Sequence, residues 1–193
     1  MSGATWLRDE RTTLATEQIL DAAGALFAER GVAAVGMAEV AAAAGCSRAT
    51  LYRYFENREA LRTAFVHREA RRIGAEVVRE VAGIDEPGER LVATVTTSLR
   101  LVRSEPTLMA WFEAAEAGAT VRLAQSSEVI EALVEPLLLA EGAAAEGDVG
   151  TDLRRRARWV VRVIVSLLTV PGADPAEEQA MVEDFVVPVV LAG

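Results

Sequence analysis

Residues 44–55 of this 193-residue chain read AGCSRATLYRYF, and they combine a break with the beginning of a short helix. Gly45 can adopt the positive φ that ends one helix, and Ser47 can cap the helix that follows. That second helix, residues 48–54, is too short to be stable on its own. Two helices joined by a short glycine-containing turn, the second one capped, are typical of a helix-turn-helix, which presents its second helix to a DNA major groove.

The rest of the chain shows the helical hydrophobic period of about 3.6 residues, and no run alternates as a half-buried strand does. The sequence therefore predicts an all-α fold of about nine helices. Capping and terminating residues set their limits, with Thr13, Asn57 and Asp174 as N-caps and Gly31 as a terminator. The expected helices span residues 14–30, 37–44, 48–54, 58–81, 90–103, 106–118, 122–140, 152–170 and 175–191, with a connection at 141–150.

The charge is distributed unevenly along the chain. The formal net charge of −9 by itself disfavours a nucleic-acid partner. Residues 45–72, however, hold seven Arg and three Glu, a net charge of +4. Residues 73–193 hold ten Arg and twenty acidic residues, a net charge of −10. The basic segment therefore coincides with the helix-turn-helix, and its guanidinium and phenol groups are of the kind that contact DNA phosphates.

Further segments around the helix-turn-helix complete a longer pattern. They read FAERG at 27–31, MAEVA at 37–41, AGCSRATLYRYF at 44–55 and NREAL at 57–61. Together they resemble the N-terminal domain of TetR-family (tetracycline-repressor-like) transcriptional regulators, over about residues 14–66, a third of the chain. The resemblance implies a three-helix helix-turn-helix DNA-binding domain, residues 1–57. It also implies a helical effector-binding and dimerisation domain, residues 58–193.

The resemblance also implies DNA contacts, position by position. Ser47 caps the recognition helix, and the next three residues, Arg48, Ala49 and Thr50, occupy the positions that read base edges. We expect Arg48 to donate a bidentate pair of hydrogen bonds to a guanine. The expected backbone and phosphate contacts come from Tyr52, Arg53, Tyr54 and Arg58.

Two departures from the family pattern concern the second helix. Gly36 stands where the family commonly has a Thr or Ser that caps this helix and contacts a phosphate, and a glycine can cap but has no side chain to donate. Ala38 stands where some members have a polar side chain that reads bases. Both departures place more of the expected readout on Arg48.

The resemblance further implies that a small molecule binds within the second domain and changes the distance between the two DNA-binding domains of a dimer. The candidate lining residues are mostly apolar with a few polar groups, which favours an apolar or weakly cationic compound, and we expect no cofactor. An ordinary core or surface position is the alternative for each candidate residue. The candidates are Met109, Trp111, Phe112, Val129, Leu133 and Trp159 as apolar lining, and His67, Glu113, Glu116, Ser126 and Thr169 as polar groups.

The last two expected helices are apolar on more than one face, as residues 159–168 and 181–190 show. A surface helix needs only one apolar stripe, so the excess indicates a second partner. A homodimer through a four-helix bundle, made of two copies of these helices, would supply that partner. The alternative is that both helices lie in the centre of a monomer.

The residue inventory argues against an enzyme. Cys46 is the single cysteine, so a disulfide framework and a multi-cysteine metal site are both excluded, and we expect its thiol to fill a small apolar gap beside the turn. His67 is the single histidine and has Ala64 three residues before it, so the paired Glu-x-x-His motif of a di-iron bundle enzyme is absent. A P-loop and a Rossmann glycine run are absent as well.

The distribution of apolar residues indicates a cytoplasmic protein without a membrane partner. Residues 1–10 lack an apolar stretch of signal-peptide length, and the apolar run 159–170 is short and interrupted by Arg162. We therefore expect a non-enzymatic, homodimeric DNA-binding regulator, a repressor released by a small molecule, with repression resting on the resemblance. The alternatives are a helical interaction bundle or a helical-bundle enzyme without DNA binding, and neither accounts for the basic helix-turn-helix.

Overall fold

The computed structural model describes residues 3–112, 120, 127–138 and 149–191. Within these ranges every regular element is a helix, which confirms the predicted all-α class. The chain forms two compact units, Met1–Val66 and His67–Gly193. None of the described helices is long and apolar enough to cross a membrane.

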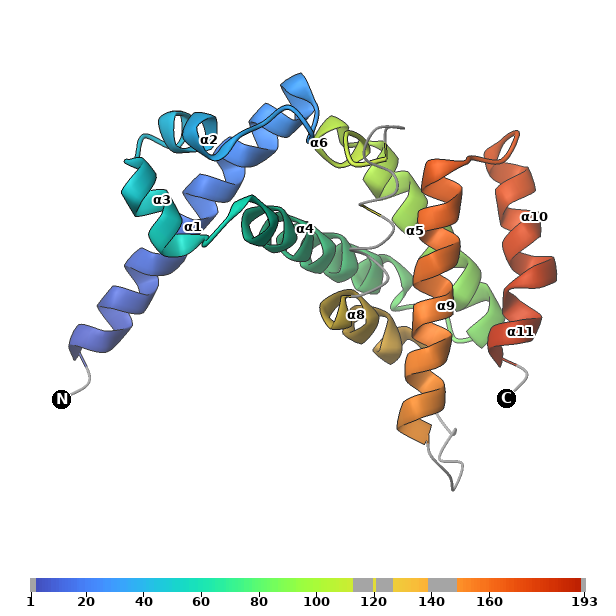
Figure 1. Cartoon of the computed structure of the whole chain (residues 1–193). Coiled ribbons are helices and arrows are strands. Elements are labelled where there is room, and N and C mark those ends of the chain that lie inside the picture. Colours follow the sequence, from blue (N-terminus) through green and yellow to red (C-terminus); the bar gives the residue numbers. More distant parts are fainter. Residues whose placement is uncertain (1–2, 113–119, 121–126, 139–148, 192–193) are drawn as a thin grey trace. The chain divides into compact units, whose positions relative to one another are not determined.

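Figure 1 labels the helices along the chain. The first unit contains α1 (Gly3–Arg30), α2 (Met37–Ala43), α3 (Arg48–Tyr54) and the first turns of α4 (Arg58–Val81). The second unit contains the rest of α4, α5 (Pro87–Arg103), α6 (Pro106–Met109), α8 (Glu128–Leu138), α9 (Val149–Thr169), α10 (Pro175–Phe185) and α11 (Val187–Leu191).

The core of the first unit fixes the helix-turn-helix on α1 and α4. The rings of Phe27 in α1 and Phe65 in α4 meet edge to face, with 5.3 Å between their centroids, and both are buried. Val40 of α2 and Leu51 of α3 are fully buried. α2 packs against both α1 and α3, so these side chains hold the three helices together as one body.

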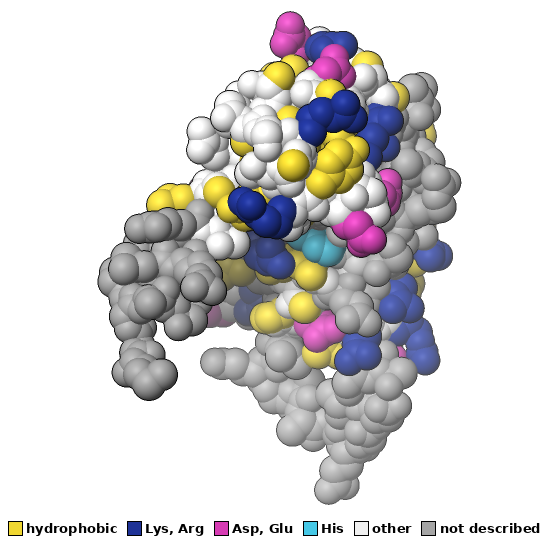
Figure 2. All heavy atoms as spheres, turned by 60° about the vertical axis from the view of Figure 1, so that its left-hand side comes forward, with side chains coloured by type: hydrophobic (Ala, Val, Ile, Leu, Met, Phe, Trp, Pro, Cys, Tyr) yellow, Lys and Arg dark blue, Asp and Glu magenta, His cyan; other side chains and the backbone are white. Residues whose placement is uncertain are grey.

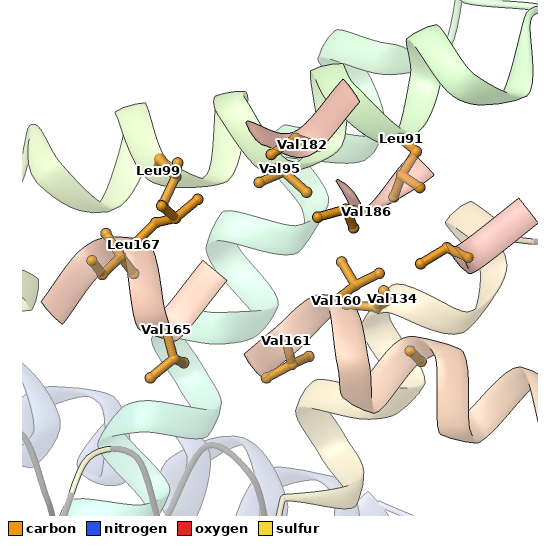
Figure 3. Packing of buried hydrophobic residues seen from close by; sticks show 13 residues of the cluster. Leu91, Val95, Leu99, Val134, Val160, Val161, Val165, Leu167, Val182 and Val186 are labelled. Carbon is orange, nitrogen blue, oxygen red and sulfur yellow. The ribbon is translucent and has the colours of Figure 1, made fainter. Parts of the chain in front are cut away.

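The core of the second unit is formed around α5, which packs against α8, α9, α10 and α11. Figure 3 shows aliphatic side chains from these helices meeting at the centre of the unit. They include Leu91, Val95 and Leu99 from α5, Val160, Val161 and Val165 from α9, and Val182 and Val186 at the end of the chain.

α1 begins at Gly3 rather than at Leu14, so the prediction that Thr13 caps it is wrong. No glycine or proline lies between Gly3 and Thr13 to stop the helix, and extending an existing helix adds one hydrogen bond for each residue that is fixed. The hydroxyl of Thr16 donates to the carbonyl of Thr12 at 2.8 Å, a bond typical of threonine inside a helix.

The predicted C-terminus of α1 is confirmed. The helix ends at Arg30, and Gly31 has the left-handed φ of +79° that the predicted terminator requires. α2 ends one residue earlier than expected, and α3 and α4 have the predicted limits. Asn57 caps α4 by accepting a hydrogen bond from the amide of Ala60 at 2.8 Å.

α5 begins at Pro87 rather than at Arg90 because the side chain of Glu86 caps it. The carboxylate of Glu86 accepts a hydrogen bond from the amide of Gly88 at 3.0 Å. A proline is favoured at the first helical position because its missing amide hydrogen would have no partner there. The helix is therefore three residues longer at its N-terminus than the sequence predicted.

α6 ends at Met109, well before the predicted residue 118, although residues 113–118 lie outside the described residues. The amides of Trp111 and Phe112 donate three residues back, to Leu108 and Met109, so the chain tightens into turns instead of continuing as an α-helix.

Two further predicted helices lie partly outside the described residues. The described part of the predicted helix 122–140 is α8, which begins at Glu128. α9 begins at Val149, three residues before the predicted start at Asp152, so it includes the end of the predicted connection 141–150. The rest of that connection is not described.

The last predicted helix is divided into α10 and α11 at Val186. Its beginning is confirmed, because Asp174 accepts hydrogen bonds from the amides of Ala176 and Glu177 at 2.8 and 2.9 Å. The division follows from Pro188, which has no amide hydrogen and disfavours helical geometry in the residue before it. Proline is tolerated there only because α11 starts afresh in its first turn.

Candidate functional site

The turn between α2 and α3 has the geometry of a Schellman motif. Gly45 has a φ of +67°, and its amide donates to the carbonyl of Ala42 at 3.2 Å. The amide of Cys46 donates to the carbonyl of Ala41 at 2.9 Å. These two bonds satisfy the last carbonyls of α2 and require the left-handed conformation that glycine adopts without strain. Cys46 is half-buried, consistent with its expected supporting position beside the turn.

α3 is held by a cap at its first residue and by two apolar anchors. The hydroxyl oxygen of Ser47 accepts a hydrogen bond from the amide of Thr50 at 3.0 Å, and the two hydroxyl oxygens are 2.9 Å apart. Leu51 and Phe55 are buried, with 0% and 6% of their surfaces exposed. Because α3 is so short, these contacts determine which of its faces points outward.

The outward face of α3 carries the predicted DNA-binding groups. Arg48, Arg53 and Tyr52 are exposed, the last of these to 44%. The guanidinium carbon of Arg53 lies 5.5 Å from the ring centroid of Tyr54, close enough for a cation–π contact. Within the described ranges no carboxylate pairs with Arg48 or Arg53. The short helix therefore displays unneutralised guanidinium groups beside phenol rings.

The side of the first unit that Figure 2 brings forward shows dark blue basic side chains beside yellow hydrophobic side chains. All basic residues of the chain are arginines. Ala49 is also exposed and Thr50 and Tyr54 are half-buried, so α3 offers small, hydroxyl and aromatic groups between the cations. Hydrogen-bond donors of this kind suit phosphate oxygens and base edges.

At the N-cap of α2, only backbone groups are available to contact a ligand. Gly36 is the N-cap and has no side-chain bond to give, as the sequence predicts. Glu39 completes the cap instead, because its carboxylate accepts a hydrogen bond from the Gly36 amide at 2.9 Å and pairs with Arg30. The hydrogen bond from the Gly36 amide is the main reason that the pKa of Glu39 lies below its usual range, and the hydrogen bond from Arg30 is the second. Ala38 is exposed.

Arg58 lies differently from the other predicted contact residues. It is half-buried, and its Nη2 donates to the carbonyl oxygen of Val32 at 3.0 Å and to that of Ala33. Arg62, one helical turn further along α4, donates to the same Val32 oxygen at 2.6 Å. Sequence reasoning missed these bonds, since no local signal links an arginine in α4 to a carbonyl in the turn between α1 and α2.

In the second unit, the structure brings His67 of α4 to the start of α8. Its Nε2 lies 2.8 Å from the hydroxyl oxygen of Ser127, which also accepts a hydrogen bond from the amide of Ile130 at 3.2 Å. Burial, followed by the charge of Arg71, lowers the pKa of His67 from 6.5, so its imidazole is neutral at pH 7. The sequence prediction named Ser126 instead of Ser127. The signal that could have identified Ser127 is its position directly before α8, where a serine commonly caps a helix.

The other predicted effector residues are spread over several elements. Trp111 is buried, and Met109, Phe112, Val129 and Leu133 are half-buried, whereas Trp159 on α9 is 41% exposed. Glu113, Glu116 and Ser126 lie outside the described residues. Thr169 donates its hydroxyl to the carbonyl of Val165 at 2.8 Å, within its own helix. That these residues line a pocket remains a prediction.

The chain is similar to bacterial regulators along nearly its whole length. The profile of the family described as bacterial regulatory proteins, tetR family, matches residues 19–65. A Mycobacterium tuberculosis protein named as an uncharacterized HTH-type transcriptional regulator is 53% identical over 190 residues, which are 98% of this chain and 92% of that protein.

Solved structures share the fold. The TetR family repressor AlkX of a Dietzia strain, implicated in biodegradation of n-alkanes, has a TM-score of 0.69 at 23% identity, over 92% of this chain and 95% of that one. RolR in complex with resorcinol has a TM-score of 0.68 at 19% identity, over 95% of this chain and 94% of that one.

Proposed function

The chain belongs to the TetR family of bacterial transcriptional regulators, and from this premise we propose that it is a homodimeric repressor that binds an inverted-repeat operator and is released by a small molecule. We assign DNA binding to residues 1–57, and effector binding and dimerisation to residues 58–193. We place the protein in the cytoplasm, where bacterial chromosomal DNA lies, and assign it no catalytic activity.

The outward face of α3 carries the proposal for DNA binding. Arg48 and Arg53 are exposed there and lack a carboxylate partner among the described residues, so their charge is available to an external anion. Arg48, at the first position of α3, is best placed to reach a guanine, as a bidentate pair of hydrogen bonds requires. Ala49 and Thr50 occupy the other base-reading positions, and Ser47 caps the helix. The remaining proposed DNA-binding residues are Gly36, Tyr52, Arg53, Tyr54 and Arg58.

The sequence assigns the proposed homodimer interface to α9 and to the helix that is divided into α10 and α11, and the exposed side chains of the latter support it. α10 and α11 bury one stripe, which contains Val182, Val186 and Val190. Next to it Met181, Phe185 and Val189 are exposed to 42%, 68% and 65% and recur every four residues. An exposed apolar stripe of this kind favours a second copy of the same helix across a two-fold axis. Two subunits related in this way carry two copies of α3, as an inverted repeat demands.

The second unit supplies candidate groups for an effector. The neutral imidazole of His67 and the hydroxyl of Ser127 form a polar pair, and Leu133 packs near Gly74 of α4. A lining dominated by apolar side chains with a few polar groups suits an apolar or weakly cationic organic molecule. A coupling free energy of about 1–3 kcal/mol between effector and DNA is enough for a switch. The proposed lining comprises His67, Met109, Trp111, Phe112, Glu113, Val129, Leu133 and Trp159.

DNA binding can be tested with duplexes that tile the DNA flanking the gene of this protein. We expect one duplex with an inverted repeat to bind, and log K to fall with log salt by about 0.9 for each phosphate that is contacted. A shuffled duplex and the variant Arg155→Ala, which removes an exposed arginine of the second unit, serve as controls. A chain that bound no duplex at low salt would instead be a helical interaction bundle or a bundle enzyme.

The dimer can be tested independently by sedimentation. Phe185→Glu places a charge in the exposed stripe, and we expect it to convert a dimer into a monomer that has lost operator affinity. Val78→Glu changes a valine of α4 that is 47% exposed and serves as the matched control. A wild-type protein that sediments as a monomer at micromolar concentration contradicts the proposed assembly.

A further inference from the structure

We propose that Arg58 and Arg62 are positioning residues for DNA binding. They hold the turn between α1 and α2 through the carbonyl oxygens of Val32 and Ala33, a set of contacts that we call the arginine clamp. The clamp fixes α2 and α3 in the orientation that reads DNA, so it rests on the proposed function. Arg58 then acts through the turn, and a direct phosphate bond is not its main contribution.

The acceptors of the clamp need these donors. Val32 is fully buried, so water does not satisfy its carbonyl oxygen. That oxygen accepts from Arg58 Nη2 at 3.0 Å and from Arg62 Nη2 at 2.6 Å. A buried carbonyl without a partner would cost as much as a lost hydrogen bond, and bonds from charged donors are the stronger kind. Removing one guanidinium leaves this oxygen with a single donor and weakens the hold on the turn, and removing both leaves it unpaired.

The spacing of the two arginines fits this use. Arg58 and Arg62 are four residues apart in α4, so they lie one above the other on the same helix face. Two like charges at that spacing repel each other, and shared bonds to carbonyl oxygens offset the repulsion. The acceptors follow the C-terminal end of α1, where the helix dipole favours cations.

Arginine is suited to this position in a way that lysine is not. Arg58 Nη2 bonds the carbonyls of both Val32 and Ala33, while the guanidinium plane fixes the direction of its donors. A lysine carries the same charge as a single ammonium group on a flexible stem and lacks that fixed geometry. Substitution by lysine therefore separates the clamp from a phosphate contact, which needs only the charge.

The clamped turn leads directly into the DNA-reading helices. It begins at Gly31 with a φ of +79° and contains Val35, which is 2% exposed. It ends at Gly36, the N-cap of α2, and α2 packs against α3. A displacement of the turn therefore moves the N-terminus of α2 and, through the packing, the recognition helix.

The decisive variants are Arg58→Lys and Arg62→Lys, which keep the charge of the chain. Arg71→Lys, on the exposed surface of α4, is the matched control. Each dimeric variant is titrated with a duplex that wild-type protein selects from random-sequence DNA, and with a shuffled duplex of equal composition. Hydrogen exchange of the α2 amides, residues 37–43, is measured on the same proteins without DNA.

We expect both clamp variants to lose at least about tenfold affinity for the selected duplex, since a charged hydrogen bond is exchanged for a poorer one. Binding of the shuffled duplex and the salt dependence should stay within about twofold of wild type, because the number of phosphate contacts is unchanged. Exchange of the α2 amides should accelerate in both variants and not in Arg71→Lys.

Other outcomes overturn the clamp or the proposed function separately. If Arg58→Lys binds like wild type while Arg58→Gln lowers the salt slope by about one phosphate, Arg58 is a phosphate ligand and the clamp is wrong. Unchanged exchange of the α2 amides in both lysine variants also refutes the clamp, whether or not DNA binds. If wild-type protein selects no DNA but the exchange accelerates, the proposed DNA binding fails and the clamp survives only as a fold contact.

Discussion

The arginines of α3 and Arg103 of the second unit have opposite surroundings. Arg103 of α5 donates to both carboxylate oxygens of Glu178, at 2.7 Å each, and Glu178 is only 3% exposed. Arg48 and Arg53 of α3 are exposed, and no carboxylate of the described residues pairs with them. Arginine thus links two helices in the second unit and is exposed to solvent in the first.

The difference follows the charge of the segments in which the arginines occur. Residues 45–72 have a net charge of +4, so few carboxylates are available near α3, whereas residues 73–193 have a net charge of −10. A segment rich in acidic residues offers more carboxylates that can pair with an arginine, and Arg68 and Arg72, at the end of the basic segment, pair with the carboxylate of Glu69. For the arginines of α3, local charge balance is therefore a more informative quantity than the net charge of −9.

The largest predicted effect comes from removing Arg103, which pairs with the buried carboxylate of Glu178. Arg103→Ala leaves the buried carboxylate of Glu178 without its main partner, and we expect it to lower the free energy of unfolding by about 3 kcal/mol. Denaturant unfolding followed by circular dichroism measures this change. Arg155→Ala, whose side chain is 75% exposed and lies 3.7 Å from Asp152, should change it by less than about 0.5 kcal/mol.

A double variant shows whether the loss in Arg103→Ala comes from an unpaired charge. Arg103→Met combined with Glu178→Leu replaces the pair by apolar side chains, an exchange that is often neutral in buried sites. We expect it to be more stable than Arg103→Ala. A double variant that is less stable would mean that Glu178 contributes through another contact, such as the hydrogen bond that it accepts from the amide of Gly172 at 2.9 Å.

Acid should release the same pair. The hydrogen bonds from Arg103 lower the pKa of Glu178 below 4.5, against burial, which raises it. The folded state therefore binds this proton less readily than the unfolded state, so the pair contributes its full stability above pH 4.5 and loses it as pH falls further. We expect the unfolding midpoint of Glu178→Gln to depend less on pH below 4.5 than that of wild type. The exposed Glu89→Gln should follow the wild-type curve, and parallel curves for all three proteins contradict this assignment.

Removing an arginine of α3 should have the reverse pattern of effects. Arg48→Ala removes no bond within the described fold, so its free energy of unfolding should stay within about 0.5 kcal/mol of wild type. Its discrimination between the selected and the shuffled duplex should fall by about 1–3 kcal/mol, the worth of a bidentate contact to a guanine. Anisotropy titrations of both duplexes measure this. An equal loss on the two duplexes would make Arg48 a phosphate contact.

Local signals account for the parts of the fold that the sequence predicted well. Gly45, Ser47, Asn57 and Asp174 each act within a few residues of their own position, so their turns and caps could be placed without knowledge of the tertiary structure. Failures occurred where a local signal competed with the continuation of a helix, as at Thr13, which has the right residue type for a cap but lies inside α1.

Long-range contacts account for the parts of the candidate sites that were not predicted. Arg58 bonds the carbonyl of Val32, 26 residues earlier, and His67 bonds the hydroxyl of Ser127, 60 residues later. Neither partner has a fixed spacing that a motif could express, since both depend on how helices pack. The sequence therefore identified the outward face of α3 but not the contacts that hold that face in position.

The smallest predicted effect sharpens the comparison by adding an anion-binding group to α2. Gly36 has an extended φ of −106°, and a Cβ there would lie 3.5 Å from Glu39 Oε2, an ordinary contact, so Gly36→Ser fits the present backbone. The new hydroxyl can cap α2 and should raise the unfolding free energy by a few tenths of a kcal/mol, about the difference between serine and glycine caps. It should also tighten the selected duplex about twofold if α2 approaches a phosphate. Gly83→Ser, at a glycine with no atom within 4 Å of an added Cβ, controls for the reduced freedom of the unfolded chain. If both serine variants change stability and DNA affinity equally, a hydroxyl at the N-terminus of α2 makes no contact with DNA. The side-chain contacts to DNA would then be assigned to α3.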